Sequence, residues 1–247
     1  MRFEDFLYSI GELTVDIAKR FESIIKDLLR PEPKDTPPNF RILRKLVKKD
    51  LSIHELISLK LQITFLIYLF INLLIVVFSP SLLVPVAILY FIYLRSLLMR
   101  TKNFIIEPEP YRAFYYSISL LTFMAFLGYV VLRGLNVRPQ YYYGYLAGVF
   151  ITVLGFRHVF RSKYGRDYTY GVVEEIKDGA VRVFVHDDIA ANVKPGYYWV
   201  DAPSDVPRGA VVKLLVEERP LRGAVPRKII EVYSSSQTST EPKEQRE

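Results

Sequence analysis

The 247-residue chain contains no cysteine, three histidines and one tryptophan. Without cysteine it has no disulfides, no thiolate catalysis and no cysteine-ligated zinc. Charged residues make up 24% of the chain but are absent from four long stretches, Leu61–Phe78, Leu82–Leu94, Ala113–Leu132 and Tyr141–Phe156. This segregation, together with a hydrophobic content of 51%, predicts a membrane protein.

The uncharged stretches have the length of transmembrane helices. Leu61–Phe78 would rise roughly 27 Å as a helix, close to the hydrocarbon thickness of about 30 Å. The second stretch spans if it continues to Met99, with Arg95 extending its side chain to the interface. Residues 95–112 are expected to form a loop, and the fourth helix is expected to end near Arg157. The fold class is therefore an α-helical polytopic membrane protein, with four transmembrane helices arranged as two hairpins over residues 61–162.

The distribution of cations predicts the orientation. Residues 61–165 carry a net charge of +7, whereas residues 166–233 carry −1. The connection before Leu82 has no cation and residues 133–138 have two, but residues 95–112 have four. By the positive-inside rule, the chain is expected to be a multi-pass protein of the plasma membrane with both termini in the cytoplasm.

The segment before the first span has three predicted parts. Residues 1–30 form an amphipathic helix with apolar side chains at alternating spacings of four and three, expected to pack on the chain itself or on a partner. Residues 31–40 are a proline-rich spacer, and residues 41–60 are a basic juxtamembrane region and helix start. The cations expected at an anionic headgroup surface are Arg41, Arg44, Lys45, Lys48 and Lys49. An acidic partner or ribosomal RNA is the alternative. Ser52 and Glu55 fit a capping box that starts the first helix.

From Tyr168 the pattern changes to short strands with alternating apolar residues, as at Val181, Val183 and Val185. Five such strands over residues 166–233 predict a small cytoplasmic all-β barrel of the OB or SH3-like type, because closure removes exposed edges. Residues 234–247 are polar and are expected to be disordered.

Two resemblances follow from particular stretches. The Leu-Ser-Ile-His-Glu-Leu-Ile-Ser-Leu-Lys-Leu-Gln run at 51–62 and the Pro-Gly-Tyr-Tyr-Trp-Val-Asp-Ala-Pro stretch at 195–203, with two helical hairpins between them, resemble an uncharacterised archaeal family of integral membrane proteins. The barrel alone is similar to the OB-type domain of NfeD-like proteins, through Gly171–Val173, Asp178-Gly179, Trp199–Ala202 and Gly209–Leu215. Neither resemblance implies a catalytic residue.

The spans contain no acid and no central base, which disfavours proton- or sodium-coupled transport. Their few polar residues are expected to bond to the backbone or between helices. Gly144, Gly148 and Thr152 form a small-residue stripe that predicts close helix packing. Its partner is either the third span, through Ala125 or Gly128, or a second copy of the chain.

Enzymatic signals are weak. Glu55 already has a capping role beside His54, and His186-Asp187-Asp188 is expected to be a solvated turn, so we expect no catalytic residue, metal or cofactor. Tyr197, Tyr198 and Trp199 are candidates for a partner surface or for packing of the barrel. The barrel sequence has ten cations and eleven anions, so nucleic acid is not the expected partner.

The sequence therefore favours a non-catalytic membrane-anchored scaffold or adaptor that presents the barrel and the amphipathic helix to a partner protein on the cytoplasmic side. An oligomeric pore or passive transporter is the alternative from another class, and a membrane-interface enzyme is the third hypothesis.

Overall fold

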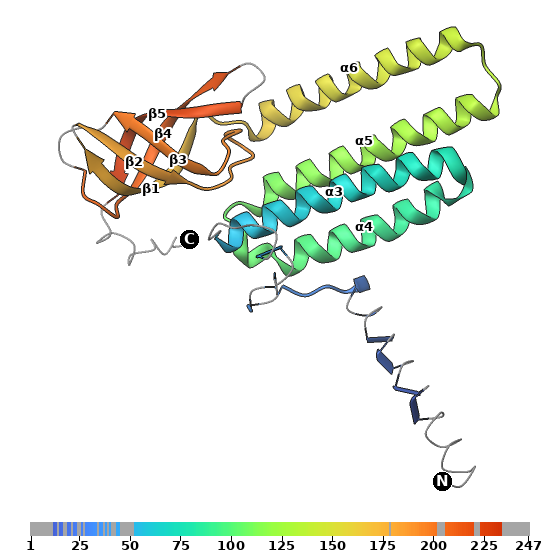
Figure 1. The fold of residues 1–247 in the computed structure, drawn as a ribbon, viewed down its shortest axis with the longest axis horizontal. Coiled ribbons are helices and arrows are strands. Elements are labelled where there is room, and N and C mark those ends of the chain that lie inside the picture. Colours follow the sequence, from blue (N-terminus) through green and yellow to red (C-terminus); the bar gives the residue numbers. More distant parts are fainter. Residues whose placement is uncertain are drawn as a thin grey trace, which may run out of the picture. The chain divides into compact units, whose positions relative to one another are not determined.

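The computed structural model describes residues 52–177, 179–201, 206–219 and 223–233, together with part of the stretch from Glu12 to Arg44 (Figure 1). The described residues between Glu12 and Leu29 are helical and mostly exposed. Most of the predicted helix over residues 1–30, and the whole tail over residues 234–247, lie outside the described residues. The chain divides into two compact units, Met1–Lys48 with Lys60–Tyr145 and Lys49–Leu59 with Leu146–Glu247. The finer domain boundaries expected from the sequence stay predictions.

Four long helices follow one another from residue 53. They are α3 (Ile53–Phe78), α4 (Leu83–Arg100), α5 (Pro108–Gly134) and α6 (Pro139–Tyr164), with short 3-10 turns η1 (Pro80–Leu82) and η2 (Lys102–Phe104) around α4. Within the described residues, these four helices, α4 together with η1, are long and apolar enough to cross a membrane. The predicted helical polytopic fold is confirmed.

Two predicted helix ends are wrong. The stretch Glu107–Pro110 was expected to be a loop, but α5 begins at Pro108. Proline is favoured in the first turn of a helix, where its missing N–H costs nothing. The fourth helix was expected to end near Arg157 but continues to Tyr164, with Arg161 and Lys163 in its last turn. Cations there interact favourably with the carbonyls at the end of the helix.

Several polar residues of the spans bond as the sequence predicted, to the backbone or between helices. The Tyr90 hydroxyl of α4 lies 3.1 Å from the Ser119 hydroxyl of α5, and the ring of Tyr90 stacks on Tyr68 of α3 at 3.7 Å between centroids. Thr122 donates to the carbonyl of Ile118. Such bonds remove the cost of an unpaired polar group in hydrocarbon.

The C-terminal strands close into a barrel in the order β1-β2-β3-β5-β4 (Figure 1). The strands are β1 (Tyr168–Lys177), β2 (Ala180–Val185), β3 (Gly196–Asp201), β4 (Val211–Arg219) and β5 (Gly223–Tyr233). All neighbours are antiparallel except β3 and β5, which pair in parallel through Asp201 and Lys228. This five-stranded closed barrel agrees with the predicted small-barrel class.

Alternation along the strands builds the barrel core. Val181, Val183 and Val185 of β2 are all fully buried, as their spacing predicted. Fourteen buried residues form one core cluster. Burying each valine contributes about 1.5–3 kcal/mol, and this core holds the strands in register.

The sequence pattern predicts the last strand over Lys228–Tyr233, but β5 begins five residues earlier, at Gly223. A proline at 226 argues against a strand, since it cannot donate to the ladder. Pro226 is tolerated because it pairs with Val216 next to a register shift between Leu215 and Val216. An irregularity in the ladder is where a strand accepts proline.

Gly171 gives a test of the barrel packing. A Cβ at this position would overlap Val183 and lie 2.8 Å from the carbonyl oxygen of Phe184. We expect Gly171→Ala to destabilise the barrel by about 1–3 kcal/mol through overpacking. Thermal unfolding of the full chain in detergent micelles measures this. Gly155→Ala is the control, because its added Cβ meets no atom within 4 Å. Equal melting temperatures for the two variants would contradict the close approach at Gly171.

Candidate functional site

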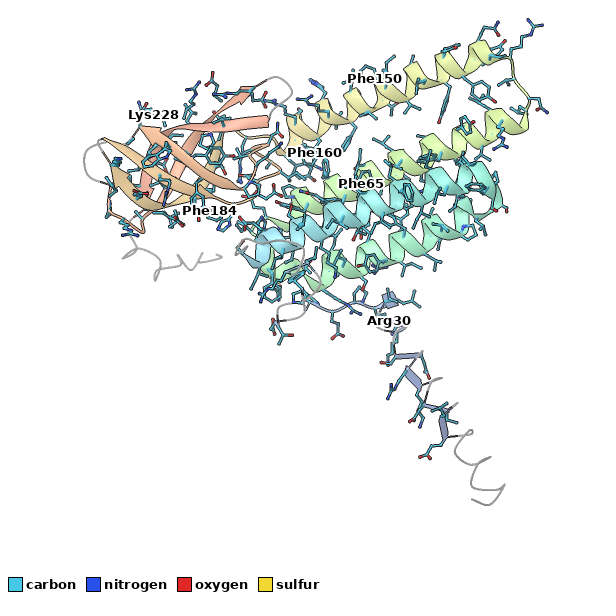
Figure 2. All side chains as sticks on the ribbon, in the orientation of Figure 1. Arg30, Phe65, Phe150, Phe160, Phe184 and Lys228 are labelled. Atoms are coloured by element: carbon cyan, nitrogen blue, oxygen red, sulfur yellow. The ribbon has the colours of Figure 1, made fainter. Side chains whose placement is uncertain are left out.

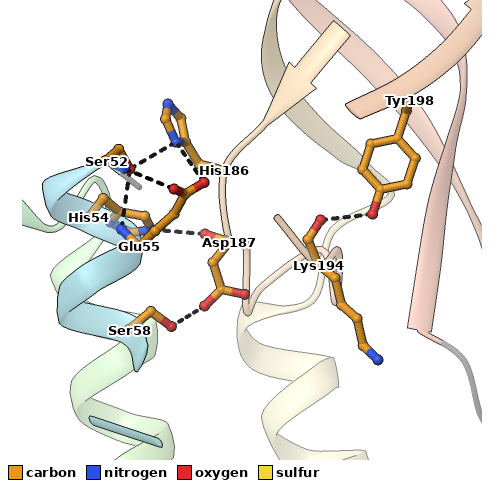
Figure 3. Close-up of polar contacts among 8 residues, drawn as sticks. All are labelled: Ser52, His54, Glu55, Ser58, His186, Asp187, Lys194 and Tyr198. Atoms are coloured by element: carbon orange, nitrogen blue, oxygen red, sulfur yellow. Dashed lines mark hydrogen bonds and ion pairs between the residues drawn. The ribbon is translucent and has the colours of Figure 1, made fainter. Parts of the chain in front are cut away.

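The first turn of α3 starts in a reciprocal hydrogen-bonded box (Figure 3). The backbone N–H of Ser52 donates to Glu55 Oε2 at 2.9 Å, and the N–H of Glu55 donates to Ser52 Oγ at 3.3 Å. The predicted capping box is confirmed, and it satisfies two of the donors that a helix start leaves unpaired. Glu55 is only 4% exposed.

The same turns of α3 bind the loop after β2. His54 Nε2 donates to the carbonyl oxygen of Asp187 at 2.9 Å, which requires the proton of His54 to be on Nε2. One turn later, the hydroxyl of Ser58 donates to the carboxylate of Asp187. One loop residue thus accepts from two side chains of α3 (Figure 3). His54 and Ser58 are both buried.

His186 completes this polar cluster. Its Nδ1 lies 3.5 Å from the Ser52 hydroxyl and 3.8 Å from Glu55 Oε1, an oxygen with no hydrogen-bond partner among the described residues. Burial lowers the pKa of His186, against the carboxylate of Glu55, which raises it, while His54 also lowers it. Neutral His186 can accept from Ser52, whereas protonated His186 would turn its Nδ1 proton toward Glu55.

Asp188 organises the rest of the loop. Its carboxylate accepts from Arg166 at 2.8 Å, from the Thr169 hydroxyl at 2.7 Å, and from the N–H groups of Ala190 and Ala191 at 3.1 and 2.9 Å. The side chain is 10% exposed. The expected solvated turn at 186–188 is therefore wrong for Asp188, because bonding to four donors repays its desolvation.

The chemistry of the cluster is that of a structural connection. The Ser52 hydroxyl is occupied as a helix cap, and His54 and Asp187 are occupied with each other. Across the described part of the chain, no three His, Asp or Glu side chains are placed to share a metal ion. That the protein uses no metal, cofactor or catalytic residue stays a prediction.

The three candidate aromatic side chains of β3 point to alternate faces of the strand, one inward and two outward. Tyr198 packs against the barrel core, donates to the carbonyl of Lys194 at 2.8 Å, and has its pKa raised by burial. Tyr197 and Trp199 point outward and are 56% and 51% exposed. On the neighbouring strand β2, Phe184 (Figure 2) pairs with Tyr197 and Arg182 pairs with Trp199, so all four side chains share the outer face of the barrel.

We name Arg182, Phe184, Tyr197 and Trp199 the β2–β3 face. Phe184 contacts Tyr197 with ring centroids 5.1 Å apart, and the guanidinium of Arg182 lies 5.3 Å over the Tyr197 ring. Arg182 also pairs with Glu175 at 3.0 Å. The face is thus aromatic with locally balanced charge, which suits a protein surface better than a polyanion. That nucleic acid is not the partner stays a prediction.

The remaining predicted residues lie elsewhere. Gly144, Gly148 and Thr152 are exposed on α6, and a Cβ at either glycine would meet no atom within 4 Å. Tyr145 of α6 contacts the third span, where it packs on Gly128 and donates to the carbonyl of Ala125. The ring of Tyr142 also lies 5.8 Å from that of Tyr129. Other α6 side chains, such as Phe150, are exposed as well (Figure 2). The packing role of the stripe stays a prediction.

Of the five predicted membrane-surface cations, the structure describes Arg44, which is exposed. The other four lie outside the described residues and are Arg41, Lys45, Lys48 and Lys49.

Sequence reasoning did not identify the connection between α3 and the barrel. Ser58 and Asp187 are 129 positions apart, and neither has a local pattern that names the other. The usable signal was indirect, since His54 and Ser58 place two hydrogen-bonding side chains one turn apart on the same face of the helix start.

The lowered pKa of His186 gives a pH test. Unfolded histidine has a pKa of about 6.5, so below that pH the unfolded chain binds a proton that the folded chain resists. We expect stability to fall as pH decreases through 6.5 toward the lower pKa of the folded state. His186→Gln should flatten this dependence, whereas His158→Gln, at an exposed position on α6, should not. Melting temperatures in micelles from pH 5 to 8 measure it, and identical slopes for wild type and His186→Gln would refute the assignment.

One protein-family model matches most of the chain. The family model described as "Predicted membrane protein (DUF2101)" matches residues 25–230. No curated protein and no solved structure gives a match. The match leaves the expected archaeal origin and the likeness to NfeD-like proteins as predictions. Because it covers well over half of the chain, and four helices able to span a membrane lie within it, this multi-pass membrane protein belongs to the DUF2101 family.

Proposed function

We propose that the protein is a non-catalytic, membrane-anchored scaffold or adaptor that offers the β2–β3 face of its barrel to a partner protein in the cytoplasm. The observation that carries this proposal is the exposure of Tyr197 and Trp199 on a barrel that is complete without them. Tyrosine and tryptophan are enriched among the few residues that supply most of the binding energy at protein interfaces, and exposed large aromatics on a small domain cost solubility.

The connection to α3 supports the anchoring role. The loop after β2 is bound by His54 and Ser58, so the strand that carries Phe184 and Arg182 ends on the first turns of a membrane span. An adaptor needs this arrangement, because a surface fixed to an anchor loses less freedom on binding than one on a flexible tether.

A photo-crosslinking amino acid at Asp201 tests the surface. Asp201 is exposed and follows Tyr197 and Trp199 on the outward side of β3. In cells, we expect this probe to capture a specific protein. Replacing Tyr197 and Trp199 together by alanine should reduce the captured amount about tenfold or more, since aromatic hot spots commonly contribute that much.

The matched control removes two other exposed aromatics, by Tyr170→Ala with Tyr233→Ala on β1 and β5. This variant should leave the crosslink intact. A crosslink that survives loss of Tyr197 and Trp199, or only lipid and self-adducts at position 201, would contradict the adaptor proposal and favour a pore assay in liposomes.

Orientation has its own test, because the chain lacks cysteine. Lys194→Cys places a single thiol on the barrel, and Gln140→Cys places one near the start of α6; both positions are exposed. With the barrel inside, an impermeant thiol reagent should label position 140 in intact cells and position 194 only after lysis. Labelling of Lys194→Cys in intact cells would remove the cytoplasmic barrel from the proposal.

A further inference from the structure

Two cations that form no ion pair with any described residue lie at similar heights on the adjacent helices α4 and α5. The hydrogen bond between Tyr90 of α4 and Ser119 of α5 shows which residues of these antiparallel helices lie at the same height along the helix axes. From this bond toward the α4–α5 connection, Arg95 is about 7.5 Å along α4, and Arg112 is about 10.5 Å along α5. The heights of Arg95 and Arg112 along the helix axes therefore differ by less than one helical turn.

A tyrosine lies beside both cations. Tyr116 is four residues after Arg112 on the same face of α5. The charges of Arg112 and Arg95 both act on its hydroxyl, which places all three groups in one electrostatic neighbourhood. Tyr116 is half-buried, while Arg95 and Arg112 are exposed. A hydroxyl donor near two guanidinium groups matches the oxygens of a phosphate.

No carboxylate of the described chain pairs with either arginine. Other cations are neutralised, as Arg166 is by Asp188 at 2.8 Å and Arg182 is by Glu175 at 3.0 Å. Glu109 is three residues before Arg112, yet the two form no ion pair. Arg95 and Arg112 therefore present two positive charges that the described residues do not compensate.

The position and the surface below it fit a lipid. Arg95 precedes the end of α4 by five residues, and Arg112 follows the start of α5 by four, so both lie where helices reach the headgroups. Toward the membrane centre, Leu120 and Met124 continue the face of Tyr116 and are 48% and 53% exposed. On α4, Ile88 lies two turns below Arg95 and is also exposed.

We infer that Arg95, Arg112 and Tyr116 form a binding site for the phosphate headgroup of an anionic phospholipid, whose acyl chains lie along Leu120, Met124 and Ile88. Basic positions between transmembrane helices commonly bind anionic headgroups. The apolar stripe below the cations selects a lipid over a free anion, because a soluble phosphate makes no use of it. This inference does not depend on the adaptor proposal.

Native mass spectrometry of the full chain in micelles tests it, with equimolar palmitoyl-oleoyl phosphatidylglycerol and phosphatidylcholine. The first retained lipid should be phosphatidylglycerol, with a preference of about 30-fold from two cations near the surface. Arg95→Gln with Arg112→Gln should bring this preference close to one. Tyr116→Phe, which removes only the hydroxyl, should weaken it about fivefold.

The matched control is Arg138→Gln with Arg157→Gln, which removes two exposed cations from other positions and should keep the preference. Circular dichroism and size-exclusion chromatography check that each variant is folded. If the double arginine variant does not fold, the lipid preference of Tyr116→Phe decides between the outcomes. Equal retention of both lipids, an unchanged preference in the double variant, or equal loss in the control would overturn the inference. Displacement of the lipid by inorganic phosphate at equal concentration would also overturn it, in favour of a free-anion site.

Discussion

Hydrocarbon offers a peptide group no water to bond with, so the backbone of a membrane span has to stay helical from one side to the other. In this protein, the irregular backbone of the described residues lies at the helix ends and in the barrel with its loops. The capping box of Ser52 and Glu55 lies at such an end. So do Arg95 and Arg112, where α4 ends and α5 begins. Within the spans, polar groups such as Tyr90 and Ser119 bond to each other.

The beginning of α3 combines two requirements in one short stretch. Its backbone donors are satisfied by the capping box, which leaves the side chains of His54 and Ser58 available for the loop after β2. The connection is specific, because Asp187 has to present its carbonyl and its carboxylate to donors one turn apart.

Much of the architecture could be predicted because its signals are local. The uncharged runs predicted the spans, the pair Ser52 and Glu55 predicted the start of a helix, and the alternating valines predicted β2. Errors arose where a local rule was overridden, as at Pro108, which begins a helix, and Pro226, which occupies an irregular pairing in β5. The contact of His54 with Asp187 could not be predicted, because it joins residues 133 positions apart and depends on how the barrel closes. Likewise, alternation predicts that Tyr198 differs from its neighbours, but the register decides which face is buried.

The place of the single tryptophan has a spectroscopic consequence. Trp199 is on the outer face of β3, half-exposed, and the spans contain tyrosine and phenylalanine but no tryptophan. Excitation at the red edge of protein absorbance therefore produces emission from one indole on the barrel surface, while the membrane helices contribute no indole signal. The unlabelled protein carries its own fluorophore beside Arg182 and Tyr197, and its emission wavelength reports the polarity at that surface alone.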